Sequence, residues 1–158
     1  MKDYNSGPLT AFDGGGDASA PSDATGFVTL DADTHYFPIP FAHVAEHLAV
    51  HVLTDATIAG TFTLEATAFP AQRGDGIGPA DVADWNEDAG KWVKLDTDAA
   101  GYAQGVGTGW TVTKLTLAKT AGAGGAVINL PNAPGRRYRL AAAITTGGTV
   151  RVGAHAKG

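Results

Sequence analysis

Residues 61–68 alternate between polar and apolar side chains along the whole segment. Four apolar or alanine side chains fall on one face, and three threonines and a glutamate fall on the other. Successive side chains of a β-strand point to opposite faces of its sheet, whereas a helix repeats about every 3.6 residues, so the alternation predicts a strand with one buried and one wet face. We expect Phe62 and Leu64 to point into a core and Thr63 to point away from it.

Short segments of the same kind recur through the rest of the chain, separated by turns rich in glycine and aspartate. The chain has 22 Gly among 158 residues and shows no long helical pattern. The sequence therefore predicts an all-β protein, an antiparallel β-sandwich of jelly-roll-like type with about eight or nine strands. The strands are expected within residues 26–30, 36–41, 47–54, 61–68, 92–95, 110–117, 126–130, 138–144 and 150–154.

Two of these segments and one turn carry local signals of their own. The two prolines within 36–41 predict a sheet edge or the entrance to a sheet, because proline cannot donate a ladder hydrogen bond. The apolar phase of 110–117 changes in its middle, which indicates a bulge or a strand buried on both faces. Residues 146–149, Thr-Gly-Gly-Thr, predict a hairpin turn.

The first 25 residues differ from the rest of the chain. Residues 13–23 are rich in glycine, aspartate and serine and offer almost nothing to bury. We therefore expect residues 1–25 to be a flexible N-terminal arm and residues 26–158 to be the β-sandwich domain. The arm would be either a frayed terminus or a segment that docks on a neighbouring subunit.

The residue inventory is poor for catalysis. Cysteine is absent, which excludes a disulfide framework, a thiolate nucleophile and a Cys-ligated zinc site. Serine occurs only within the first 22 residues, so a serine triad would need its nucleophile in the arm. A carboxylate pair for glycoside hydrolysis stays open, because such pairs meet only in the fold. We expect no enzyme activity and no cofactor.

The charge balance limits the class of partner. Lys and Arg number 11 and Asp and Glu 16, which gives a formal net charge of −5. A mildly acidic chain is a poor candidate for binding nucleic acid or an anionic membrane. There is no apolar run of about 18 residues for a membrane span, and residues 1–8 do not lead into the apolar run of a secretory signal. We expect neither nucleic acid nor a membrane among the partners.

His43, His47 and His51 are the best metal-ligand candidates because they repeat every four residues. In a helix, neighbouring members would lie about 6 Å apart, close enough for two to reach one ion. In a strand they would share a face about 13 Å apart, too far for that. The β-prone residues 50–54 favour a strand from about residue 47, so we expect a surface or subunit-interface role and no metal.

A long segment from about residue 70 to 90 is the other candidate for function, because long loops on rigid sandwiches tend to carry it. Trp85 could stack on a sugar ring. Asp81 and Asp84 lie close to it in sequence and could supply oxygen ligands, although aspartate is also a common turn former. These three residues are the candidate ligand or partner contacts of the loop.

The segment IAGTFTLEAT at 58–67, the segment GKWVKL at 90–95 and the ending from RRYRL at 136–140 to TGGTVRVGAHAKG at 146–158 carry a family resemblance. Together they resemble small β-sandwich structural proteins of tailed bacteriophages, of the capsid-decoration or head-fibre type, over about residues 27–158. The motif G-x-F-x-L-E-A followed by W-V is also similar to discoidin-like carbohydrate-binding domains.

The phage resemblance implies a jelly-roll-like subunit, often trimeric, that sits on a shell lattice and has no catalytic residue. From it we expect a non-enzymatic virion structural protein that decorates and stabilises a bacteriophage capsid. The major capsid protein would be its partner, and the capsid surface of the virion its location. A homo-oligomer is also expected, with a trimer favoured, because Ala and neutral His side chains in 43–51 form a weakly charged face that could pack near a threefold axis. The alternative is a carbohydrate-binding or host-adsorption module of a phage or bacterial surface protein.

Overall fold

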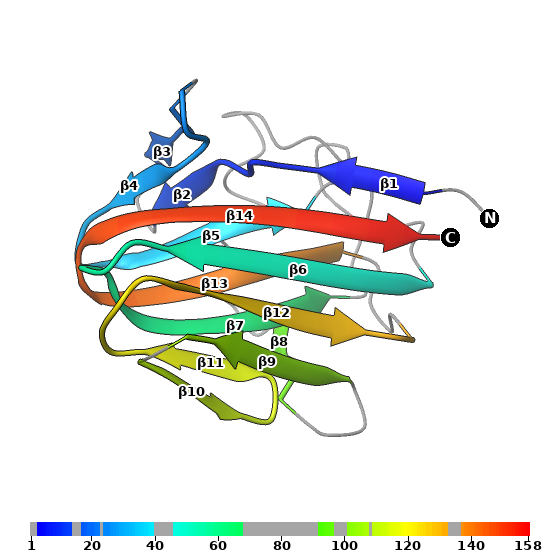
Figure 1. The fold of residues 1–158 in the computed structure, drawn as a ribbon. Helices are drawn as coiled ribbons and strands as arrows, with labels where there is room; N and C mark the ends of the chain where they lie inside the picture. The colour runs from blue at the N-terminus through cyan, green and yellow to red at the C-terminus, as the bar shows by residue number, and fades with distance from the viewer. Residues whose placement is uncertain are drawn as a thin grey trace.

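The computed structural model describes residues 3–13, 17–22, 24–39, 46–67, 92–96, 101–107, 109–132 and 137–158. These residues form two antiparallel sheets that stack face to face (Figure 1). The predicted antiparallel, jelly-roll-like β-sandwich is therefore confirmed. No helix in this part of the chain is long and apolar enough to cross a membrane.

The six-stranded sheet lies in front in Figure 1 and runs in the order β1-β14-β6-β12-β9, with β4 also paired to β14. Its longest members are β14 and β6, and each pairs with its neighbours along most of its length. The strands are β1 (Asp3–Ser6), β4 (Val28–Leu30), β6 (His47–Thr54), β9 (Tyr102–Val106), β12 (Gly124–Leu130) and β14 (Gly148–Lys157).

The eight-stranded sheet lies behind it and runs in the order β10-β11-β7-β13-β5-β2-β3, with β8 paired to β7. The predicted strand at 61–68 becomes β7 at its centre, between β11 and β13. The strands are β2 (Ala11–Asp13), β3 (Ala18–Ser19), β5 (Thr34–Ile39), β7 (Ala59–Thr67), β8 (Val93–Lys94), β10 (Trp110–Thr113), β11 (Thr116–Lys119) and β13 (Arg137–Thr146).

The core lies between the sheets and follows the alternation read from the sequence. Phe62 and Leu64 of β7 are fully buried, as predicted. The strand β13 contributes the side chains predicted to share a face, from Tyr138 to Ile144, and each is at most 5% exposed. From the other sheet, β6 and β12 contribute Leu48, Val50, Val52, Ala126, Ile128 and Leu130.

The expected division at residue 25 is corrected by the structure. The strand β1 pairs with β14, and β2 pairs with β5, so the described part of the supposed arm belongs to both sheets. Leu9, Ala11 and Phe12 are at most 4% exposed, and Leu9 N donates to Val152 O at 2.8 Å. The prediction failed because it relied on the polar composition of residues 13–23 and overlooked the short apolar cluster before them, Leu9, Ala11 and Phe12, which packs into the core.

The structure has more strands than the predicted eight or nine. Three of the additional strands lie in the supposed arm, and β9 was not predicted because its inward residues are only alanine and glycine. The predicted single strand 110–117 is in fact the hairpin β10–β11. Lys114 takes a positive φ of 55° at the turn, and the reversal of the chain explains the change of apolar phase that we interpreted as a bulge.

One local prediction is confirmed and one needs correction. The segment 36–41 contributes β5, which pairs with β13 on one side and with β2 on the other only at His35 and Tyr36, so in the described residues the strand is a sheet edge at Pro38, as predicted. Pro38 is tolerated because β2 pairs only with the first part of β5, Tyr36 and His35. The turn at 146–149 is not a hairpin within one sheet, because β13 and β14 belong to different sheets.

Candidate functional site

The outward side of the six-stranded sheet, called here the outer face, is built from three rows of residues in register across its strands. The first row runs Tyr102, Asn129, Ala49, His155 and Asn5. The second runs Gln104, Val127, His51 and Gly153, and the third runs Val106, Gly125, Leu53 and Arg151. Because side chains alternate along each strand, the residues between these rows point into the core.

The outer face is hollowed along its middle. One hollow of about 540 Å³ lies over β14 and β6, a second of about 450 Å³ lies toward His47 and Lys157, and a third of about 360 Å³ lies toward β9. The first shares Ala49 and His155 with the second, and His51 and Val127 with the third, so the three adjoin one another. The hollows form because the residues at their floor are small, at Ala49, Gly125 and Gly153.

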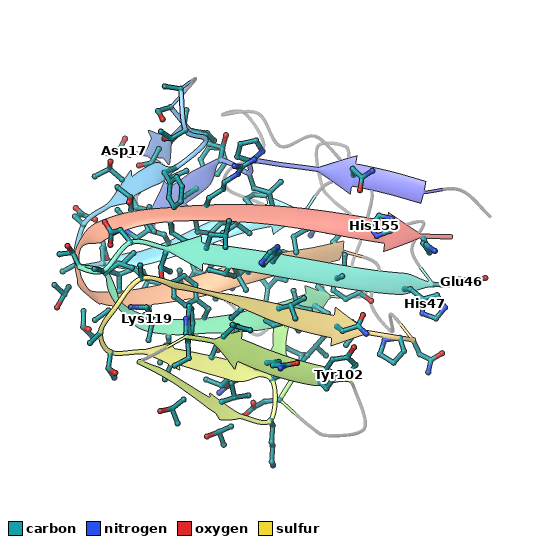
Figure 2. The ribbon with its side chains drawn as sticks, viewed as in Figure 1. Asp17, Glu46, His47, Tyr102, Lys119 and His155 are labelled. Atoms are coloured by element: carbon teal, nitrogen blue, oxygen red, sulfur yellow. The ribbon has the colours of Figure 1, made fainter. Side chains whose placement is uncertain are left out.

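The hollow combines an aliphatic floor with a polar and cationic border. His47, His51, Arg151 and Lys157 are exposed and His155 is half-buried. Figure 2 shows His47 and His155 at the same end of this sheet, with Tyr102 across it on β9. The three rows contain no acidic residue, whereas the next row on the same side, His47, Lys157 and Asp3, contains one. Such an arrangement offers packing surface, hydrogen-bond donors and positive charge, which is the chemistry of a binding surface.

The predicted strand from residue 47 is confirmed, and with it the outward direction of two of the three histidines. The strand β6 begins at His47 and turns His47 and His51 outward, opposite the buried Leu48, Val50 and Val52. His43 lies outside the described residues. The structure adds His155, which register places beside Ala49 and one step diagonally from His51. Its position near the C-terminus gave no sequence signal, because only strand pairing brings β14 next to β6.

No group of three or more His, Asp or Glu residues able to hold a metal ion occurs in the described ranges. The loop candidates Asp81, Asp84 and Trp85 lie outside these ranges, and so does the whole segment from 70 to 90. Their assignment as ligand contacts therefore stays a prediction.

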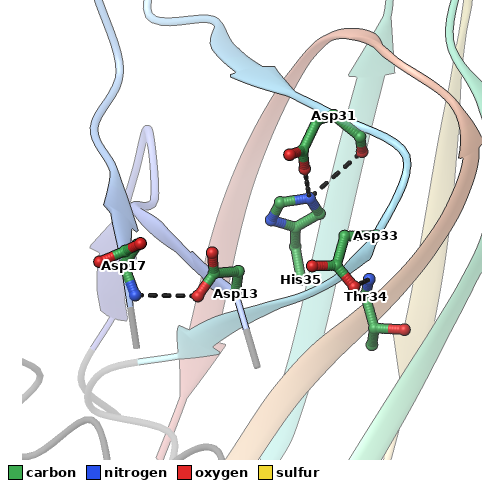
Figure 3. A network of polar contacts seen from close by, with 6 residues as sticks. All are labelled: Asp13, Asp17, Asp31, Asp33, Thr34 and His35. Atoms are coloured by element: carbon green, nitrogen blue, oxygen red, sulfur yellow. Dashed lines mark hydrogen bonds and ion pairs between the residues drawn. The ribbon is translucent and has the colours of Figure 1, made fainter. Parts of the chain in front are cut away.

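A cluster of aspartates near β5 serves the turns around it, as Figure 3 shows. Asp31 Oδ1 lies 2.9 Å from Nε2 of the buried His35. Asp33 Oδ1 accepts the Thr34 N–H at 2.7 Å, and Asp13 Oδ1 accepts the Asp17 N–H at 2.9 Å. Each carboxylate is used by the local backbone or by the histidine, which gives Asp31 and Asp33 a structural role.

The outward side of the eight-stranded sheet is covered by a stack around Arg139. Arg139 Nε donates to Glu65 Oε2 at 2.6 Å, and its guanidinium carbon lies 3.9 Å from the Tyr36 ring centroid and 4.5 Å from the Trp92 centroid. Arginine stacks readily on aromatic faces. The stack explains why Arg139 is fully buried. Thr63 on the same side, which we expected in water, is only 8% exposed.

Lys119 is a buried cationic side chain inside the sandwich. It shares a face of β11 with Leu117 and is 1% exposed, with Nζ 6.0 Å from the Trp110 ring centroid. Burial lowers the pKa of Lys119, and the charge of Asp55 only partly opposes this. Within the described part of the chain Nζ meets no hydrogen-bond partner. In Figure 2 it lies at the opposite end of the sandwich from His155.

The comparisons with known proteins add little to this geometry. No family model and no curated protein matches the chain. One solved structure to which the chain is similar is a carbohydrate-binding module that specifically recognises mannan, with 12% sequence identity. The alignment covers 99% of this chain and 89% of that chain at a TM-score of 0.31. A likeness of this size carries no argument about function.

Proposed function

We propose that the chain is a non-enzymatic structural protein of a phage virion that decorates and stabilises the capsid, attached to its protein shell through the outer face. The observation that carries the proposal is the set of adjoining hollows along that face, with an aliphatic floor at Ala49, Leu53 and Val127. A broad surface with an apolar floor suits packing against another protein. The free energy of that binding would then stabilise the assembled shell.

A second feature of the outer face favours a protein partner over a sugar. Sugar rings are commonly held by flat aromatic faces. The three rows of the outer face contain a single aromatic residue, Tyr102, at the edge strand β9. The floor itself is aliphatic, as at the packed centre of a protein interface.

Co-sedimentation with shells of the phage's major capsid protein tests the proposal. The chain should pellet with undecorated shells, and Ala49→Trp, which fills the floor of the hollow, should abolish pelleting. The matched control is Thr111→Trp on β10, an exposed strand position in the other sheet, which should pellet like the wild type. Failure of the wild type to pellet, or equal loss in both variants, would contradict attachment through this face.

Carbohydrate binding is the second candidate, and the first row of the outer face favours it. Tyr102, Asn129, His155 and Asn5 place an aromatic ring and three hydrogen-bonding groups across neighbouring strands. A glycan array decides between the two candidates. Binding that Tyr102→Ala and Asn129→Ala both remove would favour the carbohydrate module.

We also propose a homotrimer as the form that meets the shell, in line with the common closed symmetry of homo-oligomers. The cationic border argues that the outer face points to the shell and away from the threefold axis, where copies of Arg151 and Lys157 would repel each other. Light scattering on the purified protein at micromolar concentration should show the trimer, and a monomer would remove the proposal.

A further inference from the structure

Positive and titratable groups gather on the outer face although the chain as a whole is acidic, with a net charge of −5. Arg151 and Lys157 come from β14, and His47 and His51 from β6. His155 lies between them, opposite Ala49 in the register.

Most of the described acidic residues lie away from the outer face. Asp31, Asp33 and Asp55 lie in turns at one end of the sandwich, and Glu65 and Asp96 belong to the side of the eight-stranded sheet. At the border of the outer face, Asp3 of β1 stands opposite Lys157 in the register, and Glu46 precedes β6. Tyr102 is the titratable residue that β9 contributes, and β12 contributes none.

We infer that the outer face docks an acidic peptide segment of its protein partner, with carboxylates toward Arg151, His51 and His155. The inference rests on the proposed attachment to a protein shell and adds the chemistry of the partner. From β1 to β9 the face spans four strand intervals of about 4.8 Å, or about 19 Å. An extended segment of about six residues fits this length. The aliphatic floor accommodates the backbone and apolar parts of the segment.

Fluorescence anisotropy with labelled hexa-aspartate tests the inference on the purified chain without any shell. Binding should weaken as salt rises from about 0.05 M to about 0.5 M, because screening shortens the range of charge interactions. Labelled hexa-glycine, which has no side-chain carboxylates, should bind far more weakly.

Variants assign the binding to the outer face. Arg151→Gln should weaken hexa-aspartate binding by up to about fivefold, the factor expected from one exposed ion pair. The matched control Lys114→Gln removes a cation from the exposed β10–β11 turn and should change nothing.

Three outcomes would overturn the inference: hexa-aspartate binding no better than hexa-glycine, equal weakening by the Arg151 and Lys114 variants, or binding of a polyuronate with none of hexa-aspartate. The last would replace the acidic peptide with an acidic polysaccharide. These results are separate from the proposed function. If the chain pellets with shells but does not bind hexa-aspartate, the attachment to the shell stands and the acidic segment is rejected. If the chain binds hexa-aspartate but does not pellet with shells, only the attachment is rejected.

Discussion

Phe62 shows how far a single residue can be predicted. Its burial follows from the alternation of 61–68, and in the structure its ring lies 5.9 Å from that of Trp110, centroid to centroid. Phe62→Ala should lower the free energy of unfolding by about 3–5 kcal/mol because it leaves a cavity in a packed core. Thr63→Ala should cost about 1 kcal/mol, since it removes few buried atoms. Urea unfolding checks both, and equal losses would show the register to be wrong.

Lys119 could not be predicted, because an amine is expected in water and sequence periodicity alone does not override that expectation. Lys119→Met should raise the free energy of unfolding at neutral pH by about 1–3 kcal/mol, the cost of a buried polar group without a partner. The pKa of Lys119 is lowered from 10.5. The unfolded state therefore binds the proton more tightly, and protonation at lower pH destabilises the wild type.

The sign of the pH effect follows from that shift. The advantage of Lys119→Met should be largest well below the lowered pKa. It should shrink as the pH rises through the lowered pKa and past 10.5, above which the amine is neutral in both states. Urea unfolding at several pH values measures the difference between variant and wild type. If this difference in the free energy of unfolding grew with pH, or if the methionine variant were less stable than the wild type, the result would contradict a buried Nζ without a hydrogen-bond partner.

At the scale of elements, one carboxylate ties together two connections between the sheets. Asp55 follows β6, and its Oδ1 accepts the N–H groups of Thr57 and Ile58 at 2.9 Å each. Its Oδ2 accepts the N–H and hydroxyl of Thr149, which follows the β13–β14 crossover, at 2.9 Å each. Burial alone would raise the pKa of Asp55, but these hydrogen bonds outweigh it and hold the pKa below 3.8.

Asp55→Asn should lower the free energy of unfolding by about 2 kcal/mol at neutral pH, because an amide nitrogen cannot accept the bonds that one carboxylate oxygen accepts. The folded pKa is depressed, so the stabilisation is present above the unfolded value of 3.8 and is lost as the pH falls through the folded value. Thermal unfolding from neutral to acid pH should show the wild type and variant converging below that range. A constant gap would contradict the role of the charge.

Element types were more predictable than their connections. The alternation in β6, β7 and β13 identified strands and their buried faces, because that signal is local. Whether a turn joins strands of one sheet or carries the chain to the other depends on distant partners, as at Gly147, which lies against Leu30 and Asp31. For the same reason the outer face was visible only in part: His47 and His51 lie on one strand, whereas His155 and Arg151 arrive through β14.

At the scale of the whole molecule, the N-terminal residues belong to the sandwich. Removing residues 2–13 should lower the melting temperature by about 10 °C, since the deletion exposes the surface that Leu9 and Phe12 cover and costs about 3–5 kcal/mol. Differential scanning calorimetry on the isolated protein measures the change. The double variant Leu9→Ala, Phe12→Ala should reproduce much of this decrease. An unchanged melting temperature in both the deletion and the double variant would show that the N-terminal residues do not stabilise the sandwich.

The central claim concerns which face of the sandwich meets the shell, and an electron cryo-microscopy reconstruction of the virion tests it most directly. The account predicts a β-sandwich density on the capsid surface with the outer face, at β14, β6 and β12, against the major capsid protein and the eight-stranded sheet turned away. A particle without this density, or a density whose outer face is open to solvent, would contradict it.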